Sequence, residues 1–170
     1  MTTQFQLSFS MTLFGLTLFS SLSAQAACRS DIPVSVVDSR YEILATSNGS
    51  EIRDKLTGLI WQRCSVGQTW NGNSCDGSAT LHSWTDALLQ VESYGSSWRL
   101  PNIKELQSLR ETSCIDPAIN TRFFTDTERH QYWSSSPNTS NGNNAWFVEF
   151  SSGATSNYSK SNGSYVRAVR

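Results

Sequence analysis

The sequence predicts a single α+β domain, with helices in the middle of the chain and strands toward both ends. The chain has 170 residues, which is enough for one compact domain and too few for a large multidomain enzyme. Hydrophobic residues make up 38% of it, with six Trp and eight Phe, so it can bury a core. Apolar residues at helical spacing occur only in the middle, and short strand-like stretches flank that part.

The first expected elements form a β-hairpin. Glu51 to Asp54 and Leu59 to Gln62 are short stretches with the apolar content of strands. The residues between them end in Gly58, which can adopt the positive φ that a tight turn requires. The two stretches are therefore predicted to pair.

A first helix is expected after Ser83, which is suited to cap it, with Asp86 three residues later. Gly95 marks its end. Its apolar residues recur at positions i, i+3, i+4 and i+7, namely Trp84, Ala87, Leu88 and Val91.

A second helix is expected after Asn102, whose side chain can cap it while Glu105 occupies the third helical position. Pro101 sets the approach of the chain. The side predicted to be buried carries Ile103, Leu106 and Leu109.

The last third of the chain is predicted to form strands joined by polar loops. The expected strands are Tyr132 to Ser135, Ala145 to Phe150 and the closing Tyr165 to Arg170. Ser151 to Gly153 can turn the chain. Pro137 to Asn144 and Ser156 to Ser164 are rich in Ser, Asn and Gly, a composition typical of ordered loops.

The N-terminus has the pattern of a secretory signal peptide. Phe9 to Leu22 is uncharged and rich in Leu and Phe, and the Ala24-Gln25-Ala26 sequence that follows matches an A-x-A cleavage site. An uncleaved anchor is the alternative, but the apolar stretch is short for a membrane span. We therefore expect a signal peptide at residues 1–26, a lead segment at 27–50 and a domain at 51–170. The mature protein is expected in the periplasm or outside the cell, without a stable membrane span.

Four cysteines in an exported chain predict two disulfides. Of the three pairings, we favour Cys64–Cys75 with Cys28–Cys114, because the polar, turn-rich stretch between Cys64 and Cys75 can close locally. Lipid attachment at Cys28 is the alternative, and it would leave an odd number of cysteines. No Cys-x-x-Cys occurs, and His82 and His130 are isolated, so no metal site is expected.

The charge and the motifs exclude several classes of function. The formal net charge is −1 and the isoelectric point is about 6.1, so no broad positive field attracts nucleic acid. No G-x-S-x-G, P-loop, H-E-x-x-H or Rossmann glycine pattern is present, and we expect no enzymatic activity. An enzyme of unknown reaction is a less favoured alternative: two carboxylates could serve a glycosidase, but capping, turns and ion pairs account for most acidic residues.

Two sets of side chains are candidates for ligand binding. Asn side chains between the expected strands can bond to sugar hydroxyls or to Ca²⁺, although turn formation is the favoured explanation for them: Asn138, Asn141, Asn143 and Asn144. Trp faces can stack on sugar rings, and the candidates are Trp61, Trp70, Trp98, Trp133 and Trp146. Most of these residues are expected in the core, with one or two exposed.

Several blocks in order resemble the Lcl C-terminal domain family, and the most specific is the W-R-L-P-N-x-K-E-L sequence. The blocks are Asp54–Gln62, Ser83–Ala87, Trp98–Leu106, Asp116–Asn120, Tyr132–Ser136, Ala145–Phe150 and Val166–Arg170. The Trp98 to Leu106 block also has a structural explanation, because its Trp and Leu can anchor the entry to the second helix and its Arg can pair with Glu105.

The resemblance implies a C-type-lectin-like fold, with two helices beside irregular antiparallel sheets that support long polar loops. Related domains occur on secreted bacterial proteins, including the end of a collagen-like adhesin that binds sulfated glycans. This chain has no collagen-like stalk, no Glu-Pro-Asn or Trp-Asn-Asp signature of calcium-dependent lectins and no counterpart of the reactive cysteines of formylglycine-generating enzymes. No cofactor is expected, and Ca²⁺ is the one alternative.

We therefore expect a secreted, non-catalytic binding or adhesion domain for an extracellular or periplasmic glycan or protein. A structural or assembly module that binds another protein is the alternative. Trp146 and the Asn set are candidate ligand-binding residues. Cationic side chains can grip sulfate or carboxylate groups, and the candidates are Arg122, Arg129, Lys160 and Arg167.

Overall fold

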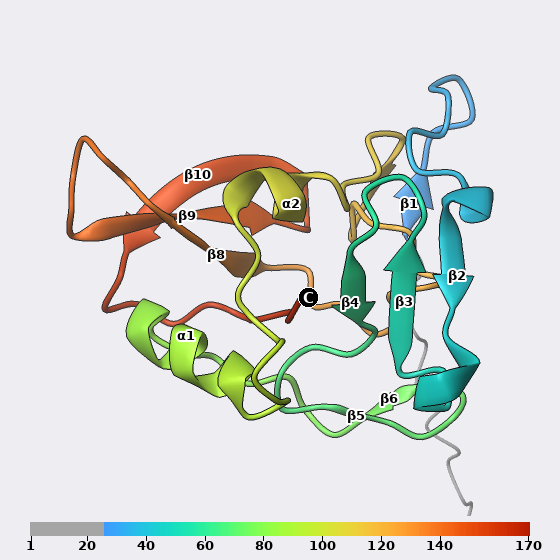
Figure 1. Cartoon of the computed structure of the whole chain (residues 1–170). Coiled ribbons are helices and arrows are strands. Elements are labelled where there is room, and N and C mark those ends of the chain that lie inside the picture. Colours follow the sequence, from blue (N-terminus) through green and yellow to red (C-terminus); the bar gives the residue numbers. More distant parts are fainter. Residues whose placement is uncertain (1–25) are drawn as a thin grey trace, which may run out of the picture.

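The computed structural model describes residues 26–170, and it is a small α+β domain, as the sequence predicts (Figure 1). Residues 1–25 of the predicted signal peptide lie outside the described part. Two α-helices, α1 (Trp84–Glu92) and α2 (Ile103–Gln107), stand beside small antiparallel sheets. Within residues 26–170, no helix has the length and apolar character needed to cross a membrane.

The larger half of the molecule is a three-stranded sheet with a helix on each face. Its strands are β8 (Gln131–Pro137), β9 (Asn144–Glu149) and β10 (Ala154–Ser159), with β9 in the centre. Neighbouring residues of a strand point to opposite faces. Tyr132 packs in one core cluster with Leu106 of α2, whereas Trp133 packs in the other with Val91 of α1. The helices therefore cover opposite faces of the sheet.

The smaller half contains the predicted hairpin. Strands β3 (Glu51–Asp54) and β4 (Ile60–Gln62) pair in antiparallel fashion, and β2 (Tyr41–Ile43) pairs with the other edge of β3. The segment at 27–50 is thus part of the fold, because it supplies β2 and the buried Tyr41.

Two short strand pairs adjoin the two disulfides, and both disulfides are the predicted ones. Strand β1 (Ala27–Cys28) pairs with β7 (Cys114–Ile115), and a disulfide joins Cys28 to Cys114. Strand β5 (Thr69–Trp70) pairs with β6 (Cys75–Asp76), and a disulfide joins Cys64 to Cys75. Short 3₁₀ helices lie at Asp38–Arg40 and Ala45–Ser47.

The predicted helix caps are confirmed. The Ser83 side chain accepts a hydrogen bond from the backbone of Asp86. Asn102 and Glu105 form a capping box, and Arg99 donates two hydrogen bonds of 2.7 Å to the Glu105 carboxylate. The W-R-L-P block therefore fixes the start of α2.

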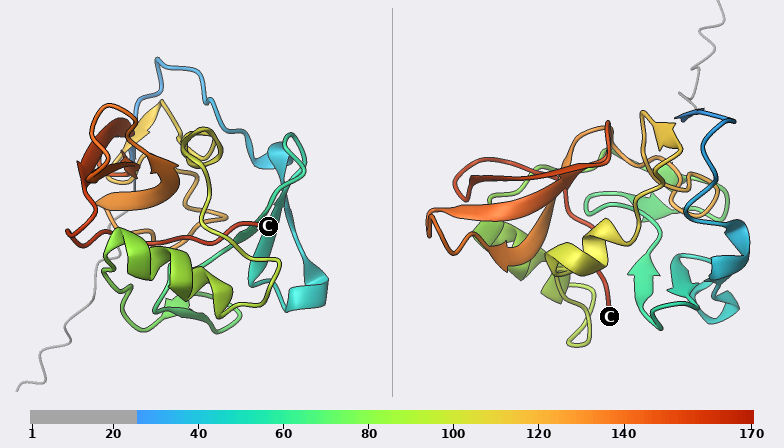
Figure 2. Two further views of the ribbon diagram at one scale, coloured as in Figure 1. Left: turned by 60° about the vertical axis from the view of Figure 1, so that its left-hand side comes forward. Right: turned by 90° about the horizontal axis from the view of Figure 1, so that it is seen from above.

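Two predictions for the C-terminal part are wrong. The first half of the expected loop Ser156–Ser164 belongs to strand β10, whose polar side chains alternate between half-buried and exposed along the edge of the sheet. The expected strand Tyr165–Arg170 makes only isolated bridges, which include Val169 with Trp61 and Val169 with Arg99. Residues 166–169 are buried because this tail runs from the larger sheet to the side of β4 (Figures 1 and 2).

Candidate ligand site around the Cys64–Cys75 loop

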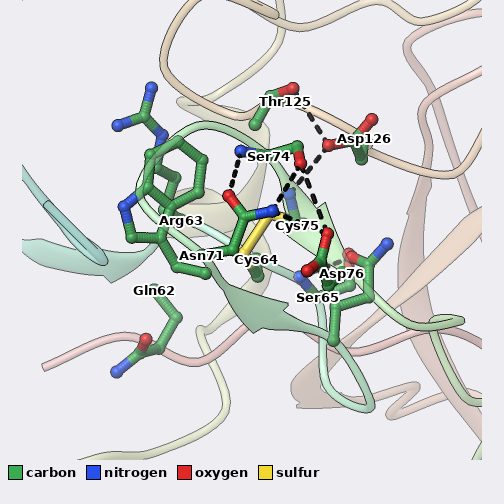
Figure 3. Close-up of a disulfide and its surroundings, with 12 residues drawn as sticks. Gln62, Arg63, Cys64, Ser65, Asn71, Ser74, Cys75, Asp76, Thr125 and Asp126 are labelled. Carbon is green, nitrogen blue, oxygen red and sulfur yellow. Dashed lines mark hydrogen bonds between the residues drawn. A yellow bond between two sulfur atoms is a disulfide. The ribbon is translucent and has the colours of Figure 1, made fainter. Parts of the chain in front are cut away.

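The loop between Cys64 and Cys75 is held by its own polar side chains. Inside it, the Asn71 side-chain oxygen accepts a hydrogen bond of 2.8 Å from the backbone of Ser74, and its amide donates to Asp76 at 2.8 Å (Figure 3). The disulfide closes the loop at its base, with a Cα–Cα distance of 5.6 Å. An irregular segment is thereby given a defined shape.

Arg167 lies beneath this loop and is fully buried. Its guanidinium donates hydrogen bonds to the carbonyl oxygens of Gln62 and Arg63, which precede the loop, and to the Thr127 hydroxyl at 2.8 Å. Burial lowers the pKa of Arg167. The C-terminal tail thus carries Arg167, a predicted ligand-binding residue, into the core, where its side chain joins the loop to the 121–130 segment.

A hollow of about 340 Å³ lies on one side of the loop, and we call it the aromatic groove. This volume is within the range of small-molecule sites. Its walls combine two aromatic rings with side-chain amides and hydroxyls. They include Trp70, Tyr94, Asn48, Gln62, Gln68 and Ser50.

Trp70 is fixed in place at the edge of the aromatic groove. Its indole Nε1–H donates a hydrogen bond of 3.2 Å to the carbonyl oxygen of Asn48. The Arg63 guanidinium carbon lies 3.8 Å from the centroid of the indole ring. The guanidinium therefore lies over the indole ring, and Trp70 is also one of the residues that line the groove.

Arg63 itself is tied to two neighbouring segments. It is buried, and it donates to the carbonyl oxygens of Gly49 at 3.3 Å and Arg122 at 3.1 Å. Gly49 has a φ of 81°, and a side chain there would press on the Trp70 indole nitrogen. Trp70 is therefore held in one orientation at the edge of the groove.

A second hollow of about 620 Å³ lies on the other side of the loop, and we call it the polar hollow. Cys75 lines it, and Gln68 lines both the polar hollow and the aromatic groove. The remaining walls come mainly from the segment that follows α2. They include Thr121, Thr125, Asp126, Thr127, Glu128, Arg129, His130 and Tyr165.

Asp126 joins the wall of the polar hollow to the disulfide loop. One of its carboxylate oxygens accepts a hydrogen bond of 2.9 Å from the backbone of Cys75 and another of 3.1 Å from the Thr125 hydroxyl (Figure 3). Elsewhere in the lining of the hollow, the rings of His130 and Tyr165 meet edge to face with their centroids 6.0 Å apart. Burial raises the pKa of Tyr165, so this phenol stays protonated at neutral pH.

The predicted Asn set gathers at the turn between β8 and β9. The Asn138 and Asn141 side chains accept hydrogen bonds from the backbone of Ser140 and Asn143, respectively. The Asn144 amide donates to Asn157 at 2.7 Å. Three of the four side chains thus have partners within the β8–β10 region, which favours the turn-forming interpretation.

Of the other predicted ligand-binding residues, some lie near the β8–β9 hairpin and others lie elsewhere in the domain. Trp146 is half-buried on β9, and Lys160 donates from its ammonium group to the carbonyl oxygen of Gly142 at 2.8 Å. Arg122 is exposed and pairs with Asp38 at 2.6 Å, whereas Arg129 lines the polar hollow. The four predicted cations therefore do not form one patch.

Sequence reasoning missed most of the aromatic groove. Trp70 was a candidate only as one of several Trp residues, and Gln62, Gln68 and Tyr94 carried no signal. The polar stretch between Cys64 and Cys75 was recognised as a loop, and a Trp inside it was the one available clue. Among residues 26–170, no group of three or more His, Cys, Asp or Glu side chains is arranged to hold a metal ion.

Comparison with known families gives one match. The sequence model of the Lcl C-terminal domain family matches residues 50–170, which include most walls of both hollows. No curated protein sequence matches the chain.

Proposed function

Because the chain belongs to the Lcl C-terminal domain family, we propose that it is a non-catalytic domain that binds a glycan in the aromatic groove. The observation that carries this proposal is the fixed position of Trp70, which lines the groove and is held by the Asn48 carbonyl and the Arg63 guanidinium. Pre-ordered rings bind at a lower entropic cost than mobile ones.

The groove has the two kinds of group that a sugar ring requires. The C–H face of a pyranose packs on a flat aromatic surface, which Trp70 and Tyr94 supply. Its hydroxyls need neutral donors and acceptors, and the amides of Gln62 and Gln68 provide both. Such contacts require no cofactor and no Ca²⁺, and we assign none.

We further propose that the protein acts in the periplasm or outside the cell. The two disulfides support this location, because disulfides persist in oxidising compartments. The signal-peptide pattern at the N-terminus supports it as well.

The test is binding of the oxidised protein to a panel of neutral and sulfated glycans, followed by calorimetry with the best ligand. Trp70→Ala is expected to weaken binding at least about tenfold, because aromatic anchors dominate small interfaces. Trp146→Ala is the matched control, since this half-buried Trp lines neither hollow. The affinity of this variant for the glycan should change less than about twofold.

Two outcomes would contradict the proposal. Equal losses in both variants, or a loss only in Trp146→Ala, would move the site to the β8–β9 hairpin. A folded protein that binds no glycan would instead favour a protein ligand and the role of an assembly module. Thermal unfolding of each variant checks that the fold is intact.

A further inference from the structure

The aromatic groove and the polar hollow meet across a single disulfide. Cys64 lines the groove and Cys75 lines the hollow, and their Cα atoms are 5.6 Å apart. Gln68 borders both. Because the two hollows share Gln68 and adjoin the same disulfide, they are neighbours that one elongated ligand can contact together.

The polar hollow offers full charges of both signs. Arg129 is exposed, and within the described part of the chain neither it nor Glu128 forms an ion pair. Asp126 uses only one carboxylate oxygen for its bonds to Cys75 and Thr125. An anionic and a cationic group of a ligand would both find partners here.

The hollow is also a preformed structure. Its buried Thr127 hydroxyl accepts a hydrogen bond from Arg167 and donates to the carbonyl oxygen of Phe124 at 2.7 Å. Asp126 is fixed to the disulfide loop on the other side. A ligand therefore meets walls that need little reordering when it binds.

We propose that the ligand is a glycopeptide, in which a sugar occupies the aromatic groove and an attached short peptide places its ammonium and carboxylate groups in the polar hollow. The sugar half rests on the proposed function. A neutral sugar chain has no charged groups that could pair with Asp126, Glu128 and Arg129. A sulfated chain would bring anions toward the two carboxylates, which repel them. A peptide with both charges is the chemistry that fits all three side chains.

The test compares three probes by calorimetry: N-acetylglucosamine, the tripeptide Ala-Glu-Lys, and an N-acetylmuramyl sugar joined to the same tripeptide. The joined probe is expected to bind at least about 30-fold more tightly than either separate probe, because the second contact becomes intramolecular. Glu128→Gln and Arg129→Gln should each remove about tenfold of that gain and leave N-acetylglucosamine affinity unchanged.

The matched controls are Glu42→Gln and Arg53→Gln, since these two residues are similarly exposed, pair with each other and line neither hollow. They should leave all affinities unchanged. If the joined probe binds no more tightly than N-acetylglucosamine, the glycopeptide inference is overturned while the glycan function stands. If the tripeptide alone equals the joined probe, the sugar contributes nothing and both proposals fail.

Discussion

The two disulfides hold two regions of different character. Cys28–Cys114 joins residues 86 positions apart and fastens the N-terminal segment to the body of the domain. Cys64–Cys75 joins residues only 11 positions apart and shapes a loop with a hollow on each side. The same kind of covalent bond thus fastens distant segments in one region and shapes a local loop between two hollows in the other.

The hydrogen bonds of the two regions differ in the same way. Near Cys114, the buried Glu111 carboxylate accepts backbone hydrogen bonds from Ser35, Val36 and Ser113 at 2.7–3.0 Å. The bonds from Ser35 and Val36 join segments 76 and 75 positions apart in the sequence. In the Cys64–Cys75 loop, the Asn71 side chain bonds only to residues within five positions. Glu111 thus ties the N-terminal segment to the domain, whereas Asn71 sets the local shape of a loop that Cys75 and Trp70 then join to distant segments.

The largest expected effect is the removal of the long-range disulfide. The double substitution Cys28→Ala/Cys114→Ala should lower the free energy of unfolding by about 4.6 kcal/mol in the chain-entropy model. Urea unfolding of the wild-type and variant proteins measures this change in the free energy of unfolding. The affinity of the folded fraction for glycan should stay within about twofold. A large loss of affinity at full folding would contradict the division of roles.

The next effect is the acid sensitivity of the Glu111 contacts. Burial raises the pKa of Glu111, but the backbone and Ser113 hydrogen bonds outweigh it and hold the pKa at about 2. The unfolded pKa is near 4.5, so this stabilisation is complete above pH 4.5 and is lost as the pH falls toward 2. Glu111→Gln should cost about 3 kcal/mol at neutral pH and flatten the stability curve over that range.

Unfolding titrations from pH 7 to pH 2 test this prediction, with Glu42→Gln as the control because Glu42 is exposed. An unchanged slope in Glu111→Gln would show that the carboxylate does not link the N-terminal segment to the domain.

Removal of the short disulfide should lower glycan affinity as well as stability, unlike removal of the long one. Cys64→Ala/Cys75→Ala is expected to cost about 2.8 kcal/mol by the same chain-entropy model. Glycan affinity of the folded variant should fall at least about tenfold, because Trp70 and Gln68 lie within the loop that the disulfide closes. Calorimetry at a temperature where the variant is folded measures this, and an unchanged affinity would show that the loop holds its shape without the bond.

The smallest effect is expected at Arg122, a cation outside both hollows. Its side chain is 75% exposed and pairs with the partly exposed Asp38. Arg122→Gln should change stability by less than about 0.5 kcal/mol and leave glycan affinity unchanged. A marked loss of affinity at low salt would place a ligand on this surface.

Elements fixed by local chemistry were predictable from the sequence. The Ser83 and Asn102 caps determine where the helices begin, and both lie next to the apolar residues that they introduce. The Cys64–Cys75 pairing followed from the polar stretch between the two cysteines. Each of these signals lies within a few residues of the element that it specifies.

Elements that depend on distant segments were not predictable. Strand β10 is polar and forms because β9 offers a free edge, which the residues of β10 do not reveal. Arg167 bonds to carbonyl groups more than 100 positions away in the chain, at Gln62 and Arg63. The aromatic groove draws on several separate segments, so no single motif marks it.

The most direct test of the account is an NMR titration that follows the indole N–H signals of the six Trp residues as the best-binding glycan is added. Binding in the aromatic groove should move the Trp70 signal most and leave the Trp146 signal nearly unchanged. A shift confined to Trp146 would contradict it and place the ligand on the β8–β9 hairpin.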